Sequence, residues 1–318
     1  MNALRVAILG VAVVLSASAW AAIPGINVGP LIEWDVQNST DETTIPNTGS
    51  LQEYGSQTIG HTLGYNKTPE ECGDPVYNAT GAKPVGAEGE GRAWFDFEQF
   101  GCIVATGSSP EPRLLGNQGY TFVGYFSISD YAWIDTTGIG GKATEMGTNT
   151  FLGVLNNGSF FSRTTVRDFT DGQWEMTRYT RQDDLSDVGI PTDGTWFQFA
   201  KVFDPANKEI RYYVDGQCVL TADWVWEWEY QGSNGVANDI PDVWHIQNNV
   251  DELGAVGYDN EWRLLKGVGY SYYAAYDYAM DDDQVLASYA FLSGTDVPEP
   301  ATMTLLTLGG LAVLRRKR

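Results

Sequence analysis

The chain has 318 residues, of which 43% are hydrophobic and 13% aromatic, so it can bury a sizeable core as one large domain or two small ones. This composition excludes a chain that is disordered over most of its length. The formal net charge of −22 argues against nucleic acid as a partner, because such a surface repels phosphate backbones.

The first 21 residues have the three parts of a secretory signal peptide. Arg5 is their only charged side chain, an apolar run extends from Val6 to Leu15, and small residues at positions 17, 19 and 21 offer two cleavage sites. The apolar run by itself is too short to span a bilayer. We expect signal peptidase to remove residues 1–21 and the rest to be exported, the alternative being an uncleaved anchor.

Helix signals are scarce in the exported part, and turn residues recur about every 8–12 residues, as in proteins built from many short strands. Residues 35–93 are rich in Gly, Pro, Asn and Thr, and we interpret them mainly as long loops with short strands. The expected strands before residue 190 cover residues 31–36, 94–97, 122–128, 151–155 and 174–179.

Residues 194–219 give the clearest pattern. A strand over 194–203 is followed by the turn sequence DPANK, a second strand begins at Glu209, and Asp215-Gly216 forms a tight-turn signal before a third strand. These signals predict three antiparallel strands in succession.

This pattern resembles the laminin-G-like and concanavalin A-like domains. The residues that match their strand–turn–strand motif are Trp196, Ala200, Phe203, Asp204, Ile210, Tyr213, Val214, Asp215 and Gly216. Residues 266–285 are similar to the closing strand and short helix of that family, with Asp281 as the expected helix cap. The resemblance covers about residues 30–293 and departs from the family at an apparent insertion near 221–243. It implies an all-β antiparallel jelly-roll sandwich, flanked by the signal peptide and a C-terminal apolar helix.

Some hydrolases on the concanavalin-like fold use three acids on one strand in an E-x-D-x-(x)-E motif. Glu33-Trp34-Asp35 begins such a motif, but Gln37 and Asn38 stand where the second glutamate belongs. Glu227-Trp228-Glu229 lacks the aspartate. His61 and His245 belong to no zinc or Ser-His-Asp motif. We expect no catalytic residue.

An aromatic strip stands inside the apparent insertion. If residues 224–230 form a strand, one of its faces carries Trp224, Trp226, Trp228 and Tyr230. The strip either covers the sandwich core or forms a flat platform on which sugar rings stack. Core packing is the favoured interpretation, and the platform stays open as a candidate glycan-binding site.

Hard oxygen ligands cluster in one loop, and concanavalin-like domains often bind calcium at a loop rim. The candidate calcium ligands are Asn248, Asn249, Asp251 and Glu252. No EF-hand spacing is present, and solvated loop acids are the alternative. We expect no other cofactor.

Three cysteines remain after export, which permits one disulfide in an oxidising compartment. Cys72 and Cys102 are the candidate pair, because both lie in the loop-rich first third of the chain. Cys218 lies in an expected strand, where we predict a buried free thiol.

The C-terminus has three parts in order. Pro298-Glu299-Pro300 precedes an apolar stretch from Ala301 to Leu314, and a basic cluster of Arg315, Arg316, Lys317 and Arg318 follows. An apolar helix that meets positive charge stops the export of a chain, so this segment anchors the protein in the membrane before processing. Loss of residues 1–21 and 301–318 removes five positive charges and no negative ones, and changes the net charge from −22 to −27.

This arrangement closely resembles the PEP-CTERM sorting signal, which implies that an exosortase recognises Pro298, Glu299 and Pro300 and processes the tail. The chain then divides into a signal peptide (1–21), a β-sandwich (30–293) and a sorting tail (294–318). We predict a non-catalytic protein of the cell surface or extracellular matrix, with extracellular polysaccharide as a candidate ligand. The alternatives are a glycoside hydrolase or lyase on the same fold, and a purely structural or adhesive protein.

Overall fold

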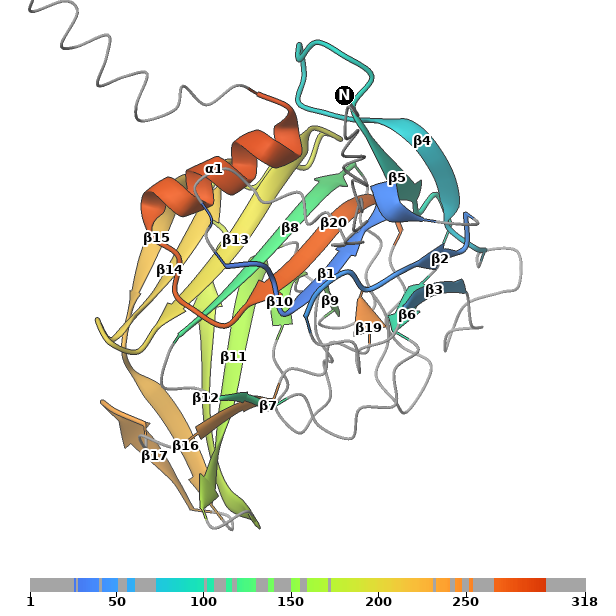
Figure 1. Cartoon of the computed structure of the whole chain (residues 1–318). Coiled ribbons are helices and arrows are strands. Elements are labelled where there is room, and N and C mark those ends of the chain that lie inside the picture. Colours follow the sequence, from blue (N-terminus) through green and yellow to red (C-terminus); the bar gives the residue numbers. More distant parts are fainter. Residues whose placement is uncertain are drawn as a thin grey trace, which may run out of the picture.

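A computed structural model of the chain describes residues 26, 28–39, 42–50, 56–60, 73–99, 102–105, 113–115, 119–129, 137–139, 150–154, 159–170, 173–230, 233–240, 244–247, 252–253 and 266–295. Within these residues the strands form three antiparallel sheets, and two of the sheets face each other as the layers of a sandwich (Figure 1). The predicted all-β antiparallel sandwich of jelly-roll type is therefore confirmed.

The first sheet brings together strands from both ends of the domain. Its order is β15 (Gln217–Asp223), β14 (Glu209–Val214), β13 (Trp196–Asp204), β8 (Tyr120–Ile128), β20 (Val268–Tyr276), β5 (Arg92–Asp96) and β4 (Val76–Ala82). Strand β1 (Ile32–Asp35) also pairs with β20, so the first and last strands of the described sandwich are neighbours. The predicted succession of three strands is confirmed as β13, β14 and β15.

The second sheet is built around a long hairpin. Its order is β17 (Ser233–Ala237), β16 (Trp226–Tyr230), β12 (Gln173–Asp184), β11 (Phe160–Thr170), β10 (Thr150–Val154) and β9 (Thr137–Ile139), while β18 (Trp244–Gln247) joins β11 to β7 (Arg113–Leu115). The β11–β12 hairpin and the β16–β17 hairpin extend beyond the first sheet, toward the bottom of Figure 1. Part of the second sheet's inner face therefore has no partner strand of the first sheet above it.

A small third sheet lies beside the sandwich. Its order is β19 (Glu252–Leu253), β6 (Cys102–Ala105), β3 (Gln57–Gly60) and β2 (Thr44–Ile45), and the short 3-10 helix η1 (Val36–Asn38) follows β1. Together with β4 and β5, these short elements agree with the interpretation of residues 35–93 as loops interrupted by short strands.

Phe151 of β10 links the two layers. Its ring centroid lies 5.0 Å from that of Phe199 and 5.6 Å from that of Tyr273, both on the first sheet. Gly124 of β8 leaves the space for these rings, because a Cβ atom there would lie 2.1 Å from the ring of Phe126 and 3.0 Å from that of Phe151. The core between the sheets is thus held by interlocked aromatic rings, which bury much apolar area per residue.

The first sheet is covered on both faces, which explains why all nine residues of β8, β13 and β20 are buried. One face packs against the second sheet. Helix α1 (Asp282–Ser293) lies across the other face over β13 to β15 (Figure 1), where Val285 and Leu292 pack with Ala200 and Tyr213. Continuous apolar strands of this kind are typical of a sheet with two covered faces.

Helix α1 begins at a complete capping box. The Asp281 carboxylate accepts a hydrogen bond from the Gln284 backbone N–H at 2.8 Å, and the Gln284 side chain accepts one from the Asp281 N–H at 3.0 Å. The expected Asp281 cap is confirmed, and the helix continues to Ser293. Gly294 ends it in the left-handed conformation with φ 69°.

We predict that Asp281→Ala lowers the free energy of unfolding by about 1 kcal/mol, since it leaves an N-terminal N–H of α1 without its acceptor. Chemical denaturation of the exported domain measures this change. The matched control is Asp283→Ala in the same first turn, which removes an exposed charge but no cap and is expected to cost only about 0.3 kcal/mol. Equal losses in both variants would contradict the role of the cap.

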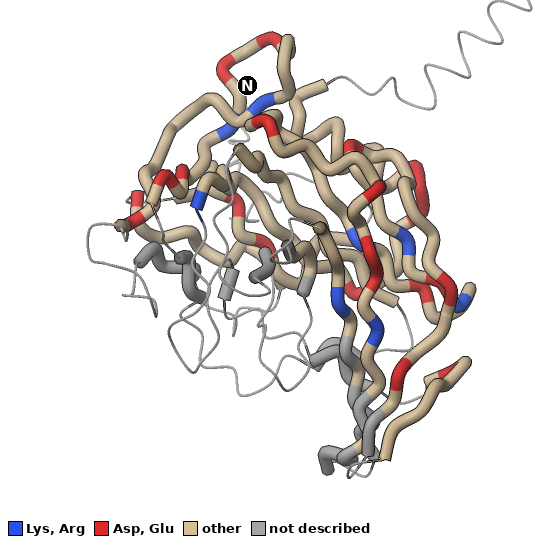
Figure 2. The backbone as a smooth tube through the Cα atoms, turned by 180° about the vertical axis from the view of Figure 1, so that it is seen from behind, with Lys and Arg blue, Asp and Glu red and all other residues tan. Residues whose placement is uncertain are grey.

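Acidic residues are spread along the described backbone and do not gather in one place (Figure 2). The chain has 41 acidic and 19 basic residues, so its net charge is strongly negative. A distributed negative surface favours solubility and weakens contact with anionic polymers and lipids.

Candidate functional site

Two aromatic residues face each other across neighbouring strands of the second sheet. Tyr179 of β12 lies directly opposite Trp228 of β16, so their side chains share one face of the sheet. This is the inner face of the second sheet. Arg181 on β12 and Trp226 on β16 are the next residues on the same face, and the Trp226 ring packs against Phe203 of the first sheet. Both Tyr179 and Trp228 are partly exposed. We call Tyr179 and Trp228 the aromatic pair.

The indole of Trp228 lies against the backbone of Gly235 on β17. A Cβ atom at Gly235 would lie 2.7 Å from the indole nitrogen and 2.9 Å from Cε2. Because glycine has no side chain, the ring can rest on the β16–β17 hairpin. Ser233, two residues before Gly235 on β17, lies on the same face of the sheet as the aromatic pair and is exposed.

The rest of the aromatic strip has a different position. Trp226 is 0% exposed and Trp224 is 7% exposed, and both rings pack against Phe203 with centroid distances of 5.9 and 4.9 Å. The alternation predicted for this strip holds, since Val225 between them is 46% exposed. A platform of four rings is therefore ruled out, because two of them are covered by the first sheet. The side chain of Tyr230 lies outside the described residues.

A buried polar cluster lies behind the aromatic pair, between the two sheets. The Arg181 guanidinium forms a bidentate ion pair with Asp183, with Nε at 3.1 and 3.0 Å from the two carboxylate oxygens. The Tyr212 hydroxyl, from the opposite sheet, donates to the same carboxylate at 2.5 Å. Burial raises the pKa of Tyr212 well above its usual value, and the Asp183 carboxylate raises it further.

Lys201 of β13 points into this same space and is only 2% exposed. Its ammonium group donates to the backbone carbonyl of Arg163 at 3.1 Å. Burial lowers the pKa of Lys201 to about 7. The nearby Asp183 carboxylate raises this pKa, and the Arg181 guanidinium lowers it by a smaller amount. The sequence analysis did not identify this cluster. The available signal was a lysine between Phe199 and Phe203 on the inward face of a strand.

The acids that begin a hydrolase-like motif have structural contacts. Glu33 accepts hydrogen bonds from the hydroxyls of Thr48 at 2.6 Å and Tyr272 at 2.8 Å. Asp35 pairs with Arg92 at 2.6 Å and accepts from the backbone N–H of Gln37. Strand β1 ends at Asp35 and η1 follows, so the alternation that would place a third acid on the same face stops there.

In the part of the chain that the structure describes, no three His, Cys, Asp or Glu side chains form a group that could hold a metal ion. The candidate calcium ligands are not tested by this finding. Asn248, Asn249 and Asp251 lie outside the described residues, and of Glu252 only the backbone, in β19, is described.

The cysteine predictions have mixed outcomes. Cys72 lies outside the described residues and only the backbone of Cys102 is described, so their pairing stays a prediction. Cys218 is a free thiol but is exposed, which corrects the expectation of a buried one. The reason is its place at the start of β15, an edge strand of the first sheet.

The fold and its C-terminal segment together define the class of protein. The chain is an antiparallel β-sandwich followed directly by a sorting tail: residues 296–318 match the family model of the PEP-CTERM protein-sorting motif. The protein is therefore an exosortase-sorted extracellular protein, as the resemblance implied. Pro298, Glu299, Pro300 and the basic cluster all lie within the matched segment. Among the described residues, no helix combines the length and apolar character needed to cross a bilayer, and the stretch from Ala301 lies outside them.

The sequence has no match among curated proteins. Similar solved structures include the binding domain of botulinum neurotoxin serotype G, with a TM-score of 0.46 and 10% identity over 82% of this chain and 51% of that chain. Domain 4 of AbnA, a GH43 extracellular arabinanase from Geobacillus stearothermophilus, in complex with arabinotriose, has a TM-score of 0.44 and 15% identity over 81% of this chain and 97% of that chain. Trypanosoma rangeli sialidase in complex with sialic acid has a TM-score of 0.42 and 11% identity over 84% of this chain and 33% of that chain. The chain spans about half the length of the toxin binding domain and a third of the sialidase.

Proposed function

We propose that the exported protein is a non-catalytic surface or matrix protein that binds glycans, and that Trp228 and Tyr179 form the surface on which a sugar ring stacks. The observation that carries the proposal is their direct cross-strand pairing on a face of the second sheet that the first sheet leaves partly open. Indole and phenol rings offer flat apolar area that matches the C–H face of a sugar ring.

The surroundings of the aromatic pair suit a sugar. Ser233 lies on the same face and is exposed, so its hydroxyl can exchange hydrogen bonds with those of a sugar. Arg181 and Asp183 behind the pair satisfy each other, so they supply no free charge to the surface. With a net charge of −22, the chain repels polyanions, and we therefore propose a neutral polysaccharide as the ligand class.

Support for a non-catalytic role comes from the described acids. Glu33 and Asp35 are each held by structural partners, and the Lys201 cluster is closed off between the sheets. An acid or base that reaches no solvent-exposed substrate cannot act on a polysaccharide. Hydrolase or lyase activity is the alternative, and the binding experiment described next would detect it as released sugar.

We predict that Trp228→Ala weakens retention on the neutral polysaccharide that the native domain binds by roughly two- to tenfold, because stacking on an aromatic ring contributes about 0.5–1.5 kcal/mol. The melting temperature should stay near that of the native domain. Affinity electrophoresis of residues 22–296 against a panel of neutral and acidic polysaccharides measures the retention.

Two further variants sharpen this test. Gly235→Ala keeps the tryptophan but places a methyl group where the indole rests, so it should weaken retention as well. Val236→Ala is the matched control, because Val236 is 69% exposed on the other face of the same strand. Equal retention in all three variants would overturn the binding site. Release of soluble sugar from any polysaccharide would overturn the non-catalytic role.

A further inference from the structure

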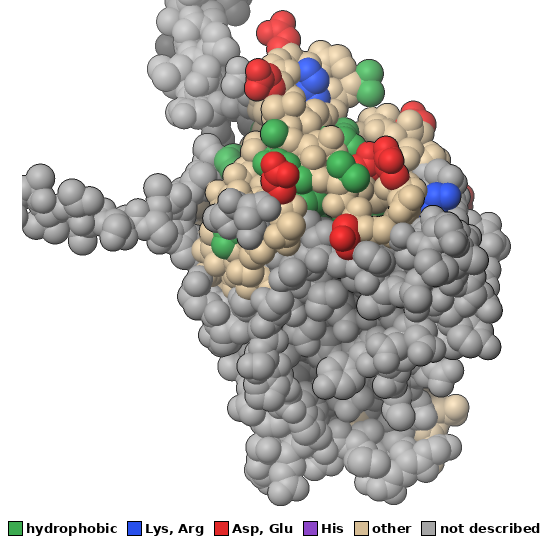
Figure 3. Space-filling model, turned by 90° about the vertical axis from the view of Figure 1, so that its right-hand side faces the viewer, with side chains coloured by type: hydrophobic (Ala, Val, Ile, Leu, Met, Phe, Trp, Pro, Cys, Tyr) green, Lys and Arg blue, Asp and Glu red, His purple; other side chains and the backbone are tan. Residues whose placement is uncertain are grey.

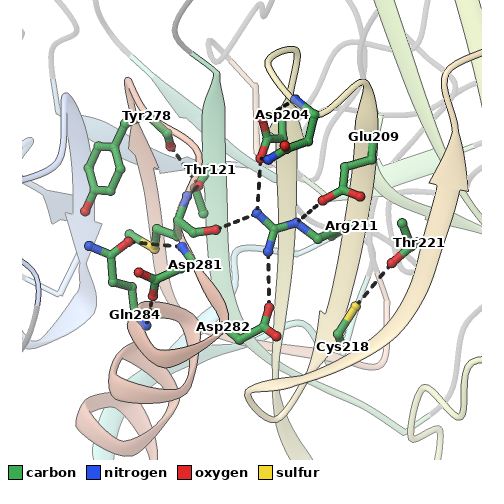
Figure 4. A network of polar contacts seen from close by, with 12 residues as sticks. Thr121, Asp204, Glu209, Arg211, Cys218, Thr221, Tyr278, Asp281, Asp282 and Gln284 are labelled. Atoms are coloured by element: carbon green, nitrogen blue, oxygen red, sulfur yellow. Dashed lines mark hydrogen bonds and ion pairs between the residues drawn. The ribbon is translucent and has the colours of Figure 1, made fainter.

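Helix α1, the last described element before the sorting tail, is bound to the sandwich at its beginning. Arg211 of β14 donates to the carbonyl of Met280 at 2.9 Å and to the Asp282 carboxylate at 3.1 Å, and the Tyr213 hydroxyl donates to the same carboxylate at 2.7 Å. Figure 4 shows Arg211 at the centre of this network, between Asp282 and the acids Asp204 and Glu209 of β13 and β14. The start of α1 is thus held by the first sheet.

The helix is also bound in its middle and at its end. The buried Gln198 amide donates to the Ser288 hydroxyl at 2.5 Å, and its oxygen accepts from the Gly216 backbone N–H at 3.1 Å. In the last turn Leu292 is 0% exposed, and the Phe291 ring centroid lies 5.3 Å from the Arg92 guanidinium carbon. Because contacts continue into the last turn, the folded domain extends to the end of α1.

Very little chain separates this end from the sorting motif. Thr295 is three residues before Pro298 and six before Ala301. Even fully extended, these linkers span only about 10 Å to the motif and about 20 Å to the apolar stretch. An enzyme that grips Pro298–Pro300 at the membrane therefore meets the folded domain at the same time.

Contacts with α1 identify the end of the sandwich that the exosortase meets. Arg92, which touches Phe291, begins β5, and its strand partner Ala82 ends β4. The β4–β5 turn (residues 83–91) thus lies beside the point where the tail leaves, as Figure 1 shows. The space-filling view in Figure 3 shows acidic side chains together with Lys or Arg side chains on this upper end. Glu88 and Glu90 of the turn are exposed, and Lys83 of the same turn donates to the Gly89 carbonyl at 2.5 Å.

We infer that the precursor presents the end formed by the β4–β5 turn and the last turn of α1 to the membrane-embedded exosortase, and that the aromatic pair points away from the membrane. The β16–β17 hairpin lies at the far end of the molecule from the exit of the tail in both Figure 1 and Figure 2. The inference rests on exosortase processing of the tail and is independent of glycan binding.

Two exposed valines allow a matched test. Val85 in the β4–β5 turn is 84% exposed, and Val236 in β17 is 69% exposed. Val85→Cys and Val236→Cys are introduced separately into a full-length Cys218→Ser precursor, because the native Cys218 thiol is exposed. Each purified precursor is coupled to a polyethylene glycol maleimide and added to membranes that contain the exosortase. Tail removal is followed by the shift in electrophoretic mobility, with the coupled Cys218→Ser parent as reference.

We expect loss of processing when the polymer is attached at position 85 and the parent rate when it is attached at 236. A flexible Gly/Ser insertion of about 12 residues between Thr295 and Asp296 adds roughly 20 Å of reach and should restore processing of the precursor coupled at position 85. Equal rates for the two coupled positions, whether both fast or both blocked, would overturn the inference. Failure of the insertion to restore processing would also overturn it. Glycan retention by the same proteins is measured separately, so that loss of the binding proposal leaves this result intact.

Discussion

Trp226→Ala is expected to lower the free energy of unfolding by about 3–5 kcal/mol, a large part of the 5–15 kcal/mol that stabilises a typical domain. The ring of Trp226 is fully buried and contacts Phe203 of the opposite sheet and Trp224, with centroids 5.9 and 5.3 Å away. Its removal leaves a cavity at the joint between the layers, which the surrounding rings fill only in part. Urea denaturation followed by tryptophan fluorescence and circular dichroism measures the loss.

Trp228→Ala is the matched control for this prediction. Trp228 lies two residues after Trp226 on the same strand and the same face, and it is partly exposed. It should cost much less stability than Trp226→Ala while it reduces glycan retention. Similar losses of stability in the two variants would show that the tryptophans have one common role, and would contradict the division of the strip into a core part and a surface part.

Lys201→Met is expected to stabilise the domain at pH 7 by several kcal/mol, and to abolish a rise in stability that the native protein shows between about pH 7 and about pH 9.5. Burial lowers the pKa of Lys201 to about 7 in the folded protein, whereas a lysine in an unfolded chain titrates near 10.4. Between these two values the unfolded chain binds more protons than the folded one. The free energy of unfolding therefore increases as the pH rises from about 7 toward the pKa of the unfolded chain. Below about pH 7 Lys201 is charged in the folded protein, and the full free-energy cost of burying this charge remains.

Denaturation curves at several pH values test this prediction. Methionine has a similar length without charge, and the lost hydrogen bond to the Arg163 carbonyl costs only about 1 kcal/mol. The measurement stays below about pH 10, because burial raises the pKa of several tyrosines above the usual value and their titration opposes the trend there. Lys208→Met is the control, since the Lys208 side chain is 55% exposed in its pair with Asp239 and should change stability by at most about 1 kcal/mol. A pH dependence that persists in Lys201→Met would contradict the assignment.

Local sequence signals were sufficient for much of the fold. The Asp204-Pro205 and Asp215-Gly216 turns placed β13, β14 and β15 correctly, because turn chemistry and alternation act over a few residues. Asp281 was identified as a cap for the same reason, since the capping box spans only four residues. The third sheet and the pairing of β1 with β20 join segments that are far apart in the chain, and no local pattern reports such contacts.

The candidate site depended far more on tertiary structure. Alternation placed Trp224, Trp226 and Trp228 on one face but did not show where the first sheet stops covering that face. Cys218 was expected to be buried because its strand looked like any other, and only its edge position exposes it. The Lys201 cluster arises from side chains on three strands of two sheets, so each member looks ordinary in its own segment.

The sequence by itself determined that this protein carries a sorting tail, which implies export, because the motif at Pro298–Pro300 is recognised as a linear segment. Periodicity and turn signals predicted many short strands, and the resemblance to concanavalin A-like domains implied the β-sandwich. Only the tertiary structure decided that two tryptophans of the strip belong to the core while Trp228 stays at the surface with Tyr179. Only the docking of α1 through its last turn showed that the folded domain ends within five residues of the sorting motif. Burial and distance depend on how the layers cover each other, and that information is absent from any single segment.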